Sequence, residues 1–490
     1  MHNNSKNQNH NSVLRKLLAN TASIAASRVI NRTTTFILYI LIGRNFGAFE
    51  FGQMSLALTL FQSFQLLTTA GLQLLLTREI AKDKTKTGHY LLHSGLVVTG
   101  LSICSILGVS IFAVSMNYIK STAIVIFLVS LSLLPYSLSI LCDSVIQAWE
   151  KMHLIAISNL IANIFKIAAA AFLIVYHYNL NYIVFSLFIS HMIGLIIKLL
   201  LMSKEIVISQ VALDLRSCVD IIKSTMTFWG IRGTQAILSS INVILLSKFA
   251  SEIEVGFYNA AKQLLVPVAL VMESTMISVY PLMCKRFNFD FGNIKPILEK
   301  LLKLLMSFVL PVGIALYFTS DWLMIVIYDQ VEFLQSAFAL RFLTLVLVLR
   351  VFTQVLGRFL VAGLKEKITL RIVIVNLMVT IVLGPFLISQ FQLLGALYTA
   401  AIVAMVNMGQ HSLAIYNIGI KVNYFHILWQ PALAGIIMVI FLLNVHFNQV
   451  LINASLAIIV YLFVFIILLI YDSGGISKFK VRVQLLLSKL

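Results

Sequence analysis

The chain has 490 residues, of which 60% are hydrophobic and 11% are charged, and its mean hydropathy is +0.97. No soluble domain buries that much apolar surface in its own core, so the composition excludes a soluble enzyme. The apolar runs are about 20 residues long, as in membrane-spanning helices, whereas porin strands alternate over about 10 residues. An all-α polytopic membrane protein is predicted. The net charge of +18 lies in the loops, so no nucleic-acid partner is expected.

Residues 1–16 form a polar tail rich in Asn, His and Gln, for which we predict disorder on the cytoplasmic side. No cleavable signal segment is expected, because Arg15 and Lys16 lead directly into a full-length apolar run. The four cysteines lie in different segments without CxxC spacing, which predicts neither disulfides nor a metal site. No P-loop or dinucleotide-binding motif is present, so no cofactor is expected.

Fourteen membrane-spanning helices are predicted from the apolar runs. They lie near residues 18–42, 52–76, 91–117, 121–145, 153–176, 181–203, 224–247, 256–282, 302–326, 334–360, 369–390, 393–417, 427–446 and 451–471.

Alternate loops between these spans differ in charge. One set carries the cations Arg78, Lys82, Lys84, Lys86, Lys204, Arg216, Lys223, Lys285, Arg286, Lys295, Lys300, Lys365 and Lys367. By the positive-inside rule these loops are cytoplasmic. The other set contains the acids Glu50, Glu252, Glu254, Asp321, Asp329 and Glu332 with few cations, and is predicted to face outward. An even number of spans then returns the basic tail, residues 472–490, to the cytoplasm.

The chain also repeats itself at a constant offset of about 204 residues. Arg28 falls on Arg232, and the same offset pairs Thr21 with Thr225, Ile37 with Ile241, Arg44 with Lys248, Glu50 with Glu254, Gly52 with Gly256 and Ala57 with Ala261. We therefore predict two lobes, 17–203 and 224–417, joined by a cytoplasmic loop at 204–223, with the last two spans at 418–471. A parallel repeat of six spans predicts a central cleft between the lobes.

Charged residues inside the spans are the main candidates for a binding site, because each costs about 2.5–3.5 kcal/mol at the centre of a bilayer. The candidate cavity cations are Arg28, Arg32, Lys166, Arg232, Lys262 and Arg350. Two acids within spans, Asp143 and Glu273, are candidates for coupling to H⁺ or Na⁺. Amides and hydroxyls should line the same cleft, namely Gln62, Gln65, Thr69, Asn159 and Asn163. Cations with amides and hydroxyls suit a ligand that is both a sugar and an anion.

Structural alternatives exist for several of these residues. Polar stripes in membrane helices also join neighbouring helices. Lys198 and Arg358 lie near cytoplasmic ends and are expected to snorkel to lipid headgroups. Arg341 is either a ligand or a partner of an outward acid, Asp321, Asp329 or Glu332. A structural role is expected for His191.

The residues that carry a family resemblance are Asn20, the run GRNFGAFEFGQMS (43–55), Gly71, the run TREI (77–80) and the run EVGFYNAAKQL (254–264). With them the chain resembles the Wzx-type O-antigen and polysaccharide flippases of the multidrug/oligosaccharidyl-lipid/polysaccharide exporter superfamily. The resemblance implies a bacterial inner-membrane transporter, not an enzyme, that moves an undecaprenyl-pyrophosphate-linked repeat unit across the membrane. It implies that Arg28 and Arg232 engage the pyrophosphate and sugars. A polysaccharide polymerase and a chain-length regulator are the implied partners.

Three alternatives remain open at this point. A multidrug or cation antiporter on the same fold would need membrane carboxylates, yet the chain has no Asp or Glu before Glu50. A polymerase or ligase would need a large outward loop, which the sequence lacks. A flippase for lipid II or a teichoic-type precursor would follow the same charge logic.

Overall fold

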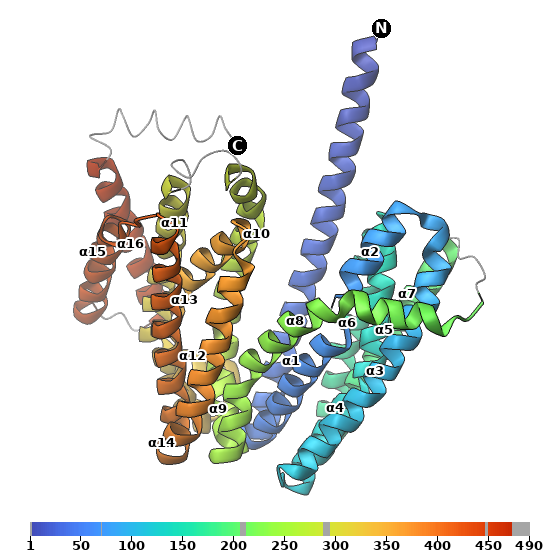
Figure 1. Ribbon diagram of the computed structural model, residues 1–490. Helices are drawn as coiled ribbons and strands as arrows, with labels where there is room; N and C mark the ends of the chain where they lie inside the picture. Colours follow the sequence, from blue (N-terminus) through green and yellow to red (C-terminus); the bar gives the residue numbers. More distant parts are fainter. Residues whose placement is uncertain (1, 70, 206–211, 288–294, 446–448, 473–490) are drawn as a thin grey trace. The chain divides into compact units, whose positions relative to one another are not determined.

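A computed structural model describes residues 2–69, 71–205, 212–287, 295–445 and 449–472 (Figure 1). These residues form helices and connecting turns, with no β-strand in the part described. Ten of the described helices are long and apolar enough to cross a membrane, so the chain is a multi-pass membrane protein. The predicted total of fourteen spans and the cytoplasmic location of both termini stay predictions.

The chain forms two compact units, Met1–Gly256 and Phe257–Leu490, and each is described by itself. The first unit holds α8, which the sequence assigned to the second lobe. Its elements are α1 (His2–Thr69), α2 (Leu72–Lys82), η1 (Lys84–Lys86), α3 (Thr87–Ser115), α4 (Lys120–Leu131), α5 (Leu133–Ala148), α6 (His153–Val175), α7 (Leu180–Glu205), α8 (Leu215–Phe249) and the first turn of α9 (Glu252–Leu264).

Helix α1 contains the first predicted span and most of the second. It begins at His2, inside the segment for which a disordered tail was predicted, and no Gly or Pro interrupts the sequence before Gly43. A break at Gly47, with φ 87°, divides α1 into two arms where the first outward loop was expected. A second break at Gly71, with φ 77°, separates α2, so the predicted span 52–76 is not one continuous helix.

Prolines mark two further breaks. The predicted span 121–145 consists of α4 and α5, and Pro135 lies in the first turn of α5. Pro267 lies likewise in the first turn of α10 (Val266–Phe287), which follows α9. Proline has no backbone N–H to donate, so it fits the first turn of a helix and disrupts the interior. The predicted spans 121–145 and 256–282 therefore each consist of two helices, α4 with α5 and α9 with α10.

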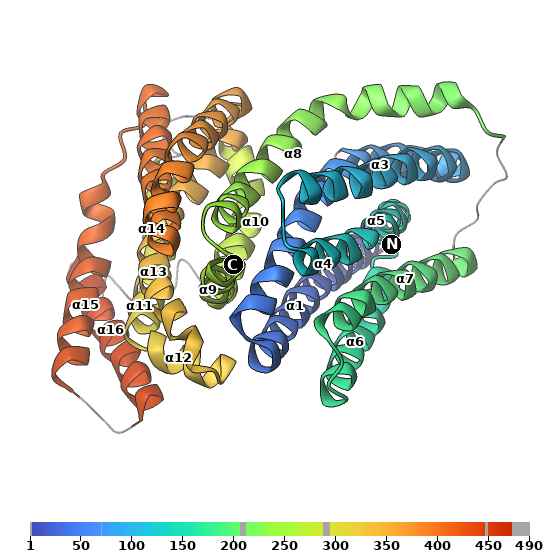
Figure 2. The same cartoon turned by 90° about the horizontal axis from the view of Figure 1, so that it is seen from below.

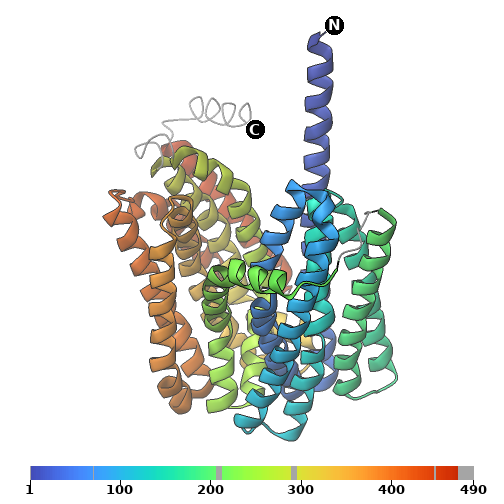
Figure 3. The ribbon, with the colours of Figure 1, turned by 45° about the vertical axis from the view of Figure 1, so that its right-hand side comes forward.

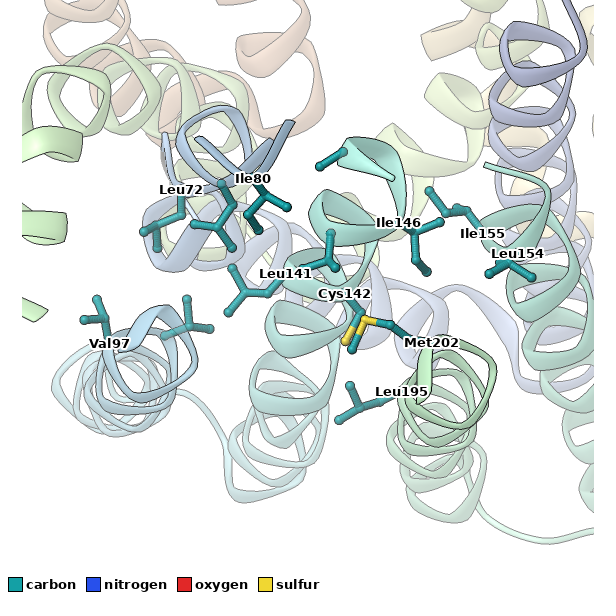
Figure 4. Packing of buried hydrophobic residues seen from close by; sticks show 14 of the residues in the cluster. Leu72, Ile80, Val97, Leu141, Cys142, Ile146, Leu154, Ile155, Leu195 and Met202 are labelled. Atoms are coloured by element: carbon teal, nitrogen blue, oxygen red, sulfur yellow. The ribbon is translucent and has the colours of Figure 1, made fainter. Parts of the chain in front are cut away.

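The core of the first unit lies among α2, α3, α5 and α7 (Figure 4). Leu76 and Ile80 of α2 are fully buried, as is Ile146 of α5. Met202 of α7 packs into the same cluster, and so does Ile221 from the start of α8. Helix α8 runs past α3, as seen in Figures 2 and 3.

The start of α8 is fastened to α3 by polar contacts. The Asp214 carboxylate caps the helix by accepting hydrogen bonds from the backbone N–H groups of Arg216 and Ser217, at 3.0 and 3.2 Å. The backbone N–H of Asp214 donates to Nε2 of the buried His93, at 2.9 Å. Nδ1 of His93 lies 2.7 Å from the carbonyl oxygen of His89, so the neutral Nδ1–H tautomer satisfies both ring nitrogens.

At the predicted outward end of the first unit, α1 crosses α9 in backbone contact. A Cβ added at Gly52 would lie 1.7 Å from the carbonyl oxygen of Glu252, and one at Gly256 would lie 2.2 Å from that of Ala48. Only residues without a side chain permit this approach. Gly52 and Gly256 are equivalent residues of the sequence repeat, so the repeat brings its own two glycines together.

Polar groups surround this crossing. The Gln53 side chain donates to Ser121 Oγ and Thr122 Oγ1, both at 2.9 Å, and Thr122 donates to Glu252 Oε1 at 3.0 Å. Nearby, Lys248 donates to the carbonyl oxygen of Met116 at 2.6 Å. These contacts hold the ends of α8 and α9 to α1 and α4.

The second unit contains the rest of α9, α10, α11 (Lys295–Phe318), α12 (Ser320–Tyr328), η3 (Val331–Phe333), α13 (Leu334–Ala362), α14 (Glu366–Asn417), α15 (Tyr424–Asn444) and α16 (Val450–Asp472). Helix α14 breaks at Gln392, with φ 50°, between the two spans predicted at 369–390 and 393–417. The predicted span 302–326 also consists of two helices, because α11 ends at Phe318 and the short α12 follows. Helices α15 and α16 pack against α11 around the fully buried Tyr461.

Replacing Gly52 by Ala should destabilise the protein by about 1–3 kcal/mol, because the new methyl group overlaps the backbone of α9. Thermal unfolding in detergent measures the effect. Gly100→Ala on α3 is the matched control, since no atom lies within 4 Å of the added Cβ. Equal melting temperatures for the two variants would contradict the close crossing.

Replacing Asp214 by Ala should loosen the first turn of α8, which hydrogen exchange of its backbone amides reports. Asp220→Ala, an exposed acid further along α8, is the control. Hydrogen bonds from the Ser217 side chain and the Arg216 backbone lower the pKa of Asp214 below its usual value of 3.8. The cap is therefore intact at neutral pH and is lost on acidification below about pH 4. Unchanged exchange at pH 7 in Asp214→Ala would refute the cap.

Candidate functional site

Helices α1 and α6 run in parallel and are joined by side-chain hydrogen bonds. The Asn159 amide donates to Ser27 Oγ at 2.7 Å, and the Asn163 amide donates to Asn31 Oδ1 one turn further along. Both pairs have the same sequence separation, so the two helices are in fixed register. These asparagines were predicted to line a cavity, and each uses a donor to hold α1 in place.

The fixed register determines where two arginines of α1 lie. Arg28 and Arg32 directly follow Ser27 and Asn31, and both side chains are exposed. In the described part of the chain no carboxylate forms an ion pair with either arginine. The two guanidinium groups lie four residues apart on one helical face, as the sequence predicts.

Lys166 lies on α6, three residues beyond Asn163. Its side chain is 9% exposed, and the structure records no hydrogen bond or ion pair for it among the described residues. A buried ammonium without a counter-ion is costly in a membrane protein. Lys166 therefore stays a candidate cavity cation.

Lys198 behaves differently from Lys166. Its Nζ lies 2.7 Å from Asp143 Oδ1 and 2.8 Å from Ser139 Oγ, and its side chain is 3% exposed. The prediction that Lys198 snorkels to lipid headgroups is wrong, because a carboxylate on α5 neutralises it inside the unit. Asp143, a candidate for ion coupling, is the partner in this pair.

Three aromatic rings pack together among α1, α5 and α7. His191 of α7 stacks on Phe61 of α1, with centroids 5.9 Å apart, and meets Tyr136 of α5 edge-on at 5.0 Å. Phe61 also meets Tyr136 edge-on, with centroids 5.4 Å apart. The three rings thus form one cluster inside the first unit.

Gln62, Gln65 and Thr69 are the polar residues predicted to line the cleft from the second arm of α1, and they differ in their surroundings. Gln62 is exposed. The Gln65 amide donates to Thr69 Oγ1 of its own helix at 3.0 Å, and Thr68 bonds Ser137 of α5 at 2.8 Å. The predicted residues Gln65 and Thr69 therefore bond within α1, and the bond to α5 comes from the neighbouring Thr68.

In the second unit, Lys262 and Glu273 are half-buried and Arg350 is exposed. Arg341 forms an ion pair with Asp321 and donates to Ser320 Oγ, so one of the three acids predicted as its partners holds it. The Arg232 side chain lies outside the described residues, so its cavity role stays a prediction.

A sequence model of the polysaccharide biosynthesis protein family matches residues 17–287. The chain belongs to this family. The match runs from residue 17 in α1 to the end of α10 and so includes every residue of the cluster described above. No curated protein sequence matches the chain significantly.

Solved structures with the same fold are those of membrane transporters. The lipid II flippase MurJ, in an inward closed conformation, superposes with a TM-score of 0.76 at 15% identity, covering 91% of this chain and 98% of that one. An inward-facing multidrug resistance MATE transporter superposes with a TM-score of 0.62 at 13% identity, covering 81% and 99%. A MOP superfamily transporter from Pyrococcus furiosus superposes with a TM-score of 0.52 at 11% identity, covering 81% of this chain and 95% of that one. These likenesses establish the fold of this family member.

Sequence reasoning missed the contribution of His191 and Tyr136 to the cluster. His191 precedes Lys198 by seven residues on α7, and Tyr136 precedes Asp143 by seven on α5. Seven residues are about two helical turns, so each pair lies on one face of its helix. That spacing was visible in the sequence, but the pairing of α5 with α7 was not.

Breaking the buried pair by Lys198→Met should destabilise the protein by about 3–5 kcal/mol, because the Asp143 carboxylate loses its counter-ion. Adding Asp143→Asn to that variant should restore much of the loss. Thermal unfolding in detergent of the two single variants and the double variant completes the cycle. Additive effects of the two substitutions would contradict a direct pair.

Proposed function

We propose that this protein is a flippase that moves an undecaprenyl-pyrophosphate-linked oligosaccharide repeat unit, of O-antigen or another surface polysaccharide, across the bacterial cytoplasmic membrane. The observation that carries the proposal is the first arm of α1, which presents Arg28 and Arg32 with no carboxylate paired to either in the described chain. Membership in the polysaccharide biosynthesis family supports a glycan cargo, and the flippase and transporter fold supports transport.

The chemistry of the cargo matches these residues. A diphosphate has several acceptor oxygens and binds best to guanidinium groups, which donate two hydrogen bonds in parallel. Arg28 and Arg32 supply two such groups one helical turn apart, and Arg232 is the proposed equivalent in the sequence repeat. The head group would stay with these cations while the polyprenyl tail remains in lipid, so no charge crosses bare hydrocarbon.

Alternating access would carry the bound head group from one side to the other. Lys262 and Arg350 are proposed as further contacts for the cargo, together with Gln62, Gln65 and Thr69. Coupling to H⁺ or Na⁺ would use Glu273 or the Asp143 pair. A polymerase and a chain-length regulator would act on the product.

A multidrug antiporter is the alternative on the same fold. Such a protein needs a free carboxylate in the membrane to hold a cationic drug. In the first unit, the candidate acid Asp143 is already neutralised by Lys198. The excess of unpaired cations in the first unit favours an anionic cargo. A flippase for lipid II or a teichoic-type precursor differs only in the glycan, which the diphosphate chemistry does not distinguish.

Replacing Arg28 or Arg32 by Ala should reduce surface polysaccharide by about tenfold or more, because a charge-assisted contact to the diphosphate is lost. Lipid-linked repeat units should accumulate on the cytoplasmic side. Periodate or lectin labelling of inside-out membrane vesicles, compared with intact cells, measures this sidedness. Arg216→Ala, an exposed arginine at the start of α8, is the control. Normal surface polymer in both variants, at wild-type protein levels, would overturn the proposal.

A further inference from the structure

We propose that His93 is a pH-sensitive latch, which fastens the start of α8 to α3 while its ring is neutral and releases it when the ring is protonated. The latch lies where α8 follows the loop predicted between the two lobes. Histidine is the side chain that ordinarily changes charge between pH 5 and 8. The inference concerns the attachment of α8 and is independent of the cargo.

The two ring nitrogens of His93 have opposite roles. The backbone N–H of Asp214 can only donate, so Nε2 of His93, at 2.9 Å, is an acceptor that carries no proton. The ring proton is therefore on Nδ1, 2.7 Å from the carbonyl oxygen of His89. A second proton can bind only at Nε2, where it would face the N–H of Asp214. The charged ring cannot hold α8 in this way.

The surroundings of His93 do not stabilise a charged ring. Its side chain is fully buried, whereas the Asp214 carboxylate is exposed and accepts hydrogen bonds from N–H groups of its own helix. Cys218 of α8 donates to the His93 carbonyl oxygen at 3.8 Å, and the ring of His89 lies 4.3 Å away, with Lys86 one turn before it. Helices α1, α2, α4 and α5 also pack against α3, and in the described chain no charged group from them contacts the His93 ring.

The other contacts at the start of α8 are few. Ile221 is buried in the core cluster of the first unit, whereas Leu215, Val219 and Ile222 are exposed. The hydrogen bond to His93 is therefore a large part of what fastens the first two turns of α8.

Helix α8 is also attached at its other end, by groups of a different kind. Lys248 donates to the carbonyl oxygen of Met116 at 2.6 Å, and the Tyr118 hydroxyl bonds Ser247 Oγ at 2.7 Å. Neither lysine nor tyrosine is a side chain that ordinarily changes charge between pH 5 and 8. Acidification over this range should therefore release the start of α8 and leave its end in place.

The direction of the pH effect follows from which state binds the proton. The attached state requires neutral His93, so a proton binds only the detached state, in which a solvated histidine has a pKa of about 6.5. The attachment is therefore constant above about pH 6.5 and weakens about tenfold for each pH unit below it. The Asp214 cap is lost only below about pH 4, so the two effects are separate.

Hydrogen exchange of backbone amides 214–222 tests the latch on the full chain in nanodiscs between pH 5 and 8, with labelling times corrected for the intrinsic pH dependence of exchange. In the wild type, protection of these amides should fall about tenfold between pH 6.5 and 5.5, while amides 240–248 at the other end of α8 keep theirs. His93→Gln retains an acceptor and a donor without a titratable ring, so its protection should not change with pH. His89→Gln, one turn away on α3, is the matched control and should behave as wild type.

Three results would overturn the latch. One is wild-type protection at the start of α8 that stays constant from pH 8 to pH 5. Another is a loss of protection on acidification that persists in His93→Gln at an unchanged melting temperature, which would place the titrating group elsewhere. The third needs no substitution of His93: if the pH dependence disappears in His89→Gln, His89 is the titrating residue and the assignment to His93 is wrong.

Discussion

A charged or amide group that leaves water for the membrane interior must find a partner inside the protein, and this constraint explains how the first unit is assembled. Asn159 and Asn163 meet this requirement by bonding Ser27 and Asn31, which holds α6 parallel to α1. Asp143 meets it through Lys198. Each bond joins two helices, so the same groups that would be costly alone determine the helix register.

The residues that do not satisfy this constraint are the informative ones. Lys198 and Lys166 are both buried lysines on neighbouring helices, yet one has a carboxylate at 2.7 Å and the other has no recorded partner in the described chain. The paired lysine stabilises the unit. The unpaired lysine, with Arg28 and Arg32, gives the unit an excess of positive charge that a lipid-linked anion would balance. Family membership and the transporter fold agree with that cargo.

The predicted outward end of the first unit depends on the absence of side chains. Gly52 and Gly256 bring the backbones of α1 and α9 into contact, and Gln53, Thr122 and Glu252 bond around them. The two glycines are equivalent in the sequence repeat, so one ancestral position supplies both sides of the crossing. Close backbone packing is a strong form of association in lipid, where hydrophobic burial no longer drives helices together.

The sequence alone determined the local features: helical class, the family resemblance, the break of α14 near Gln392, and the shared face of Arg28 and Arg32. These follow from hydropathy, turn residues and helical spacing, which act over a few residues. Only the tertiary structure decided that Lys198 is buried against Asp143, that α8 belongs to the first unit, and that His191 packs against Phe61 and Tyr136. Those contacts join residues on different helices, and which helix faces come together depends on packing that no single segment encodes.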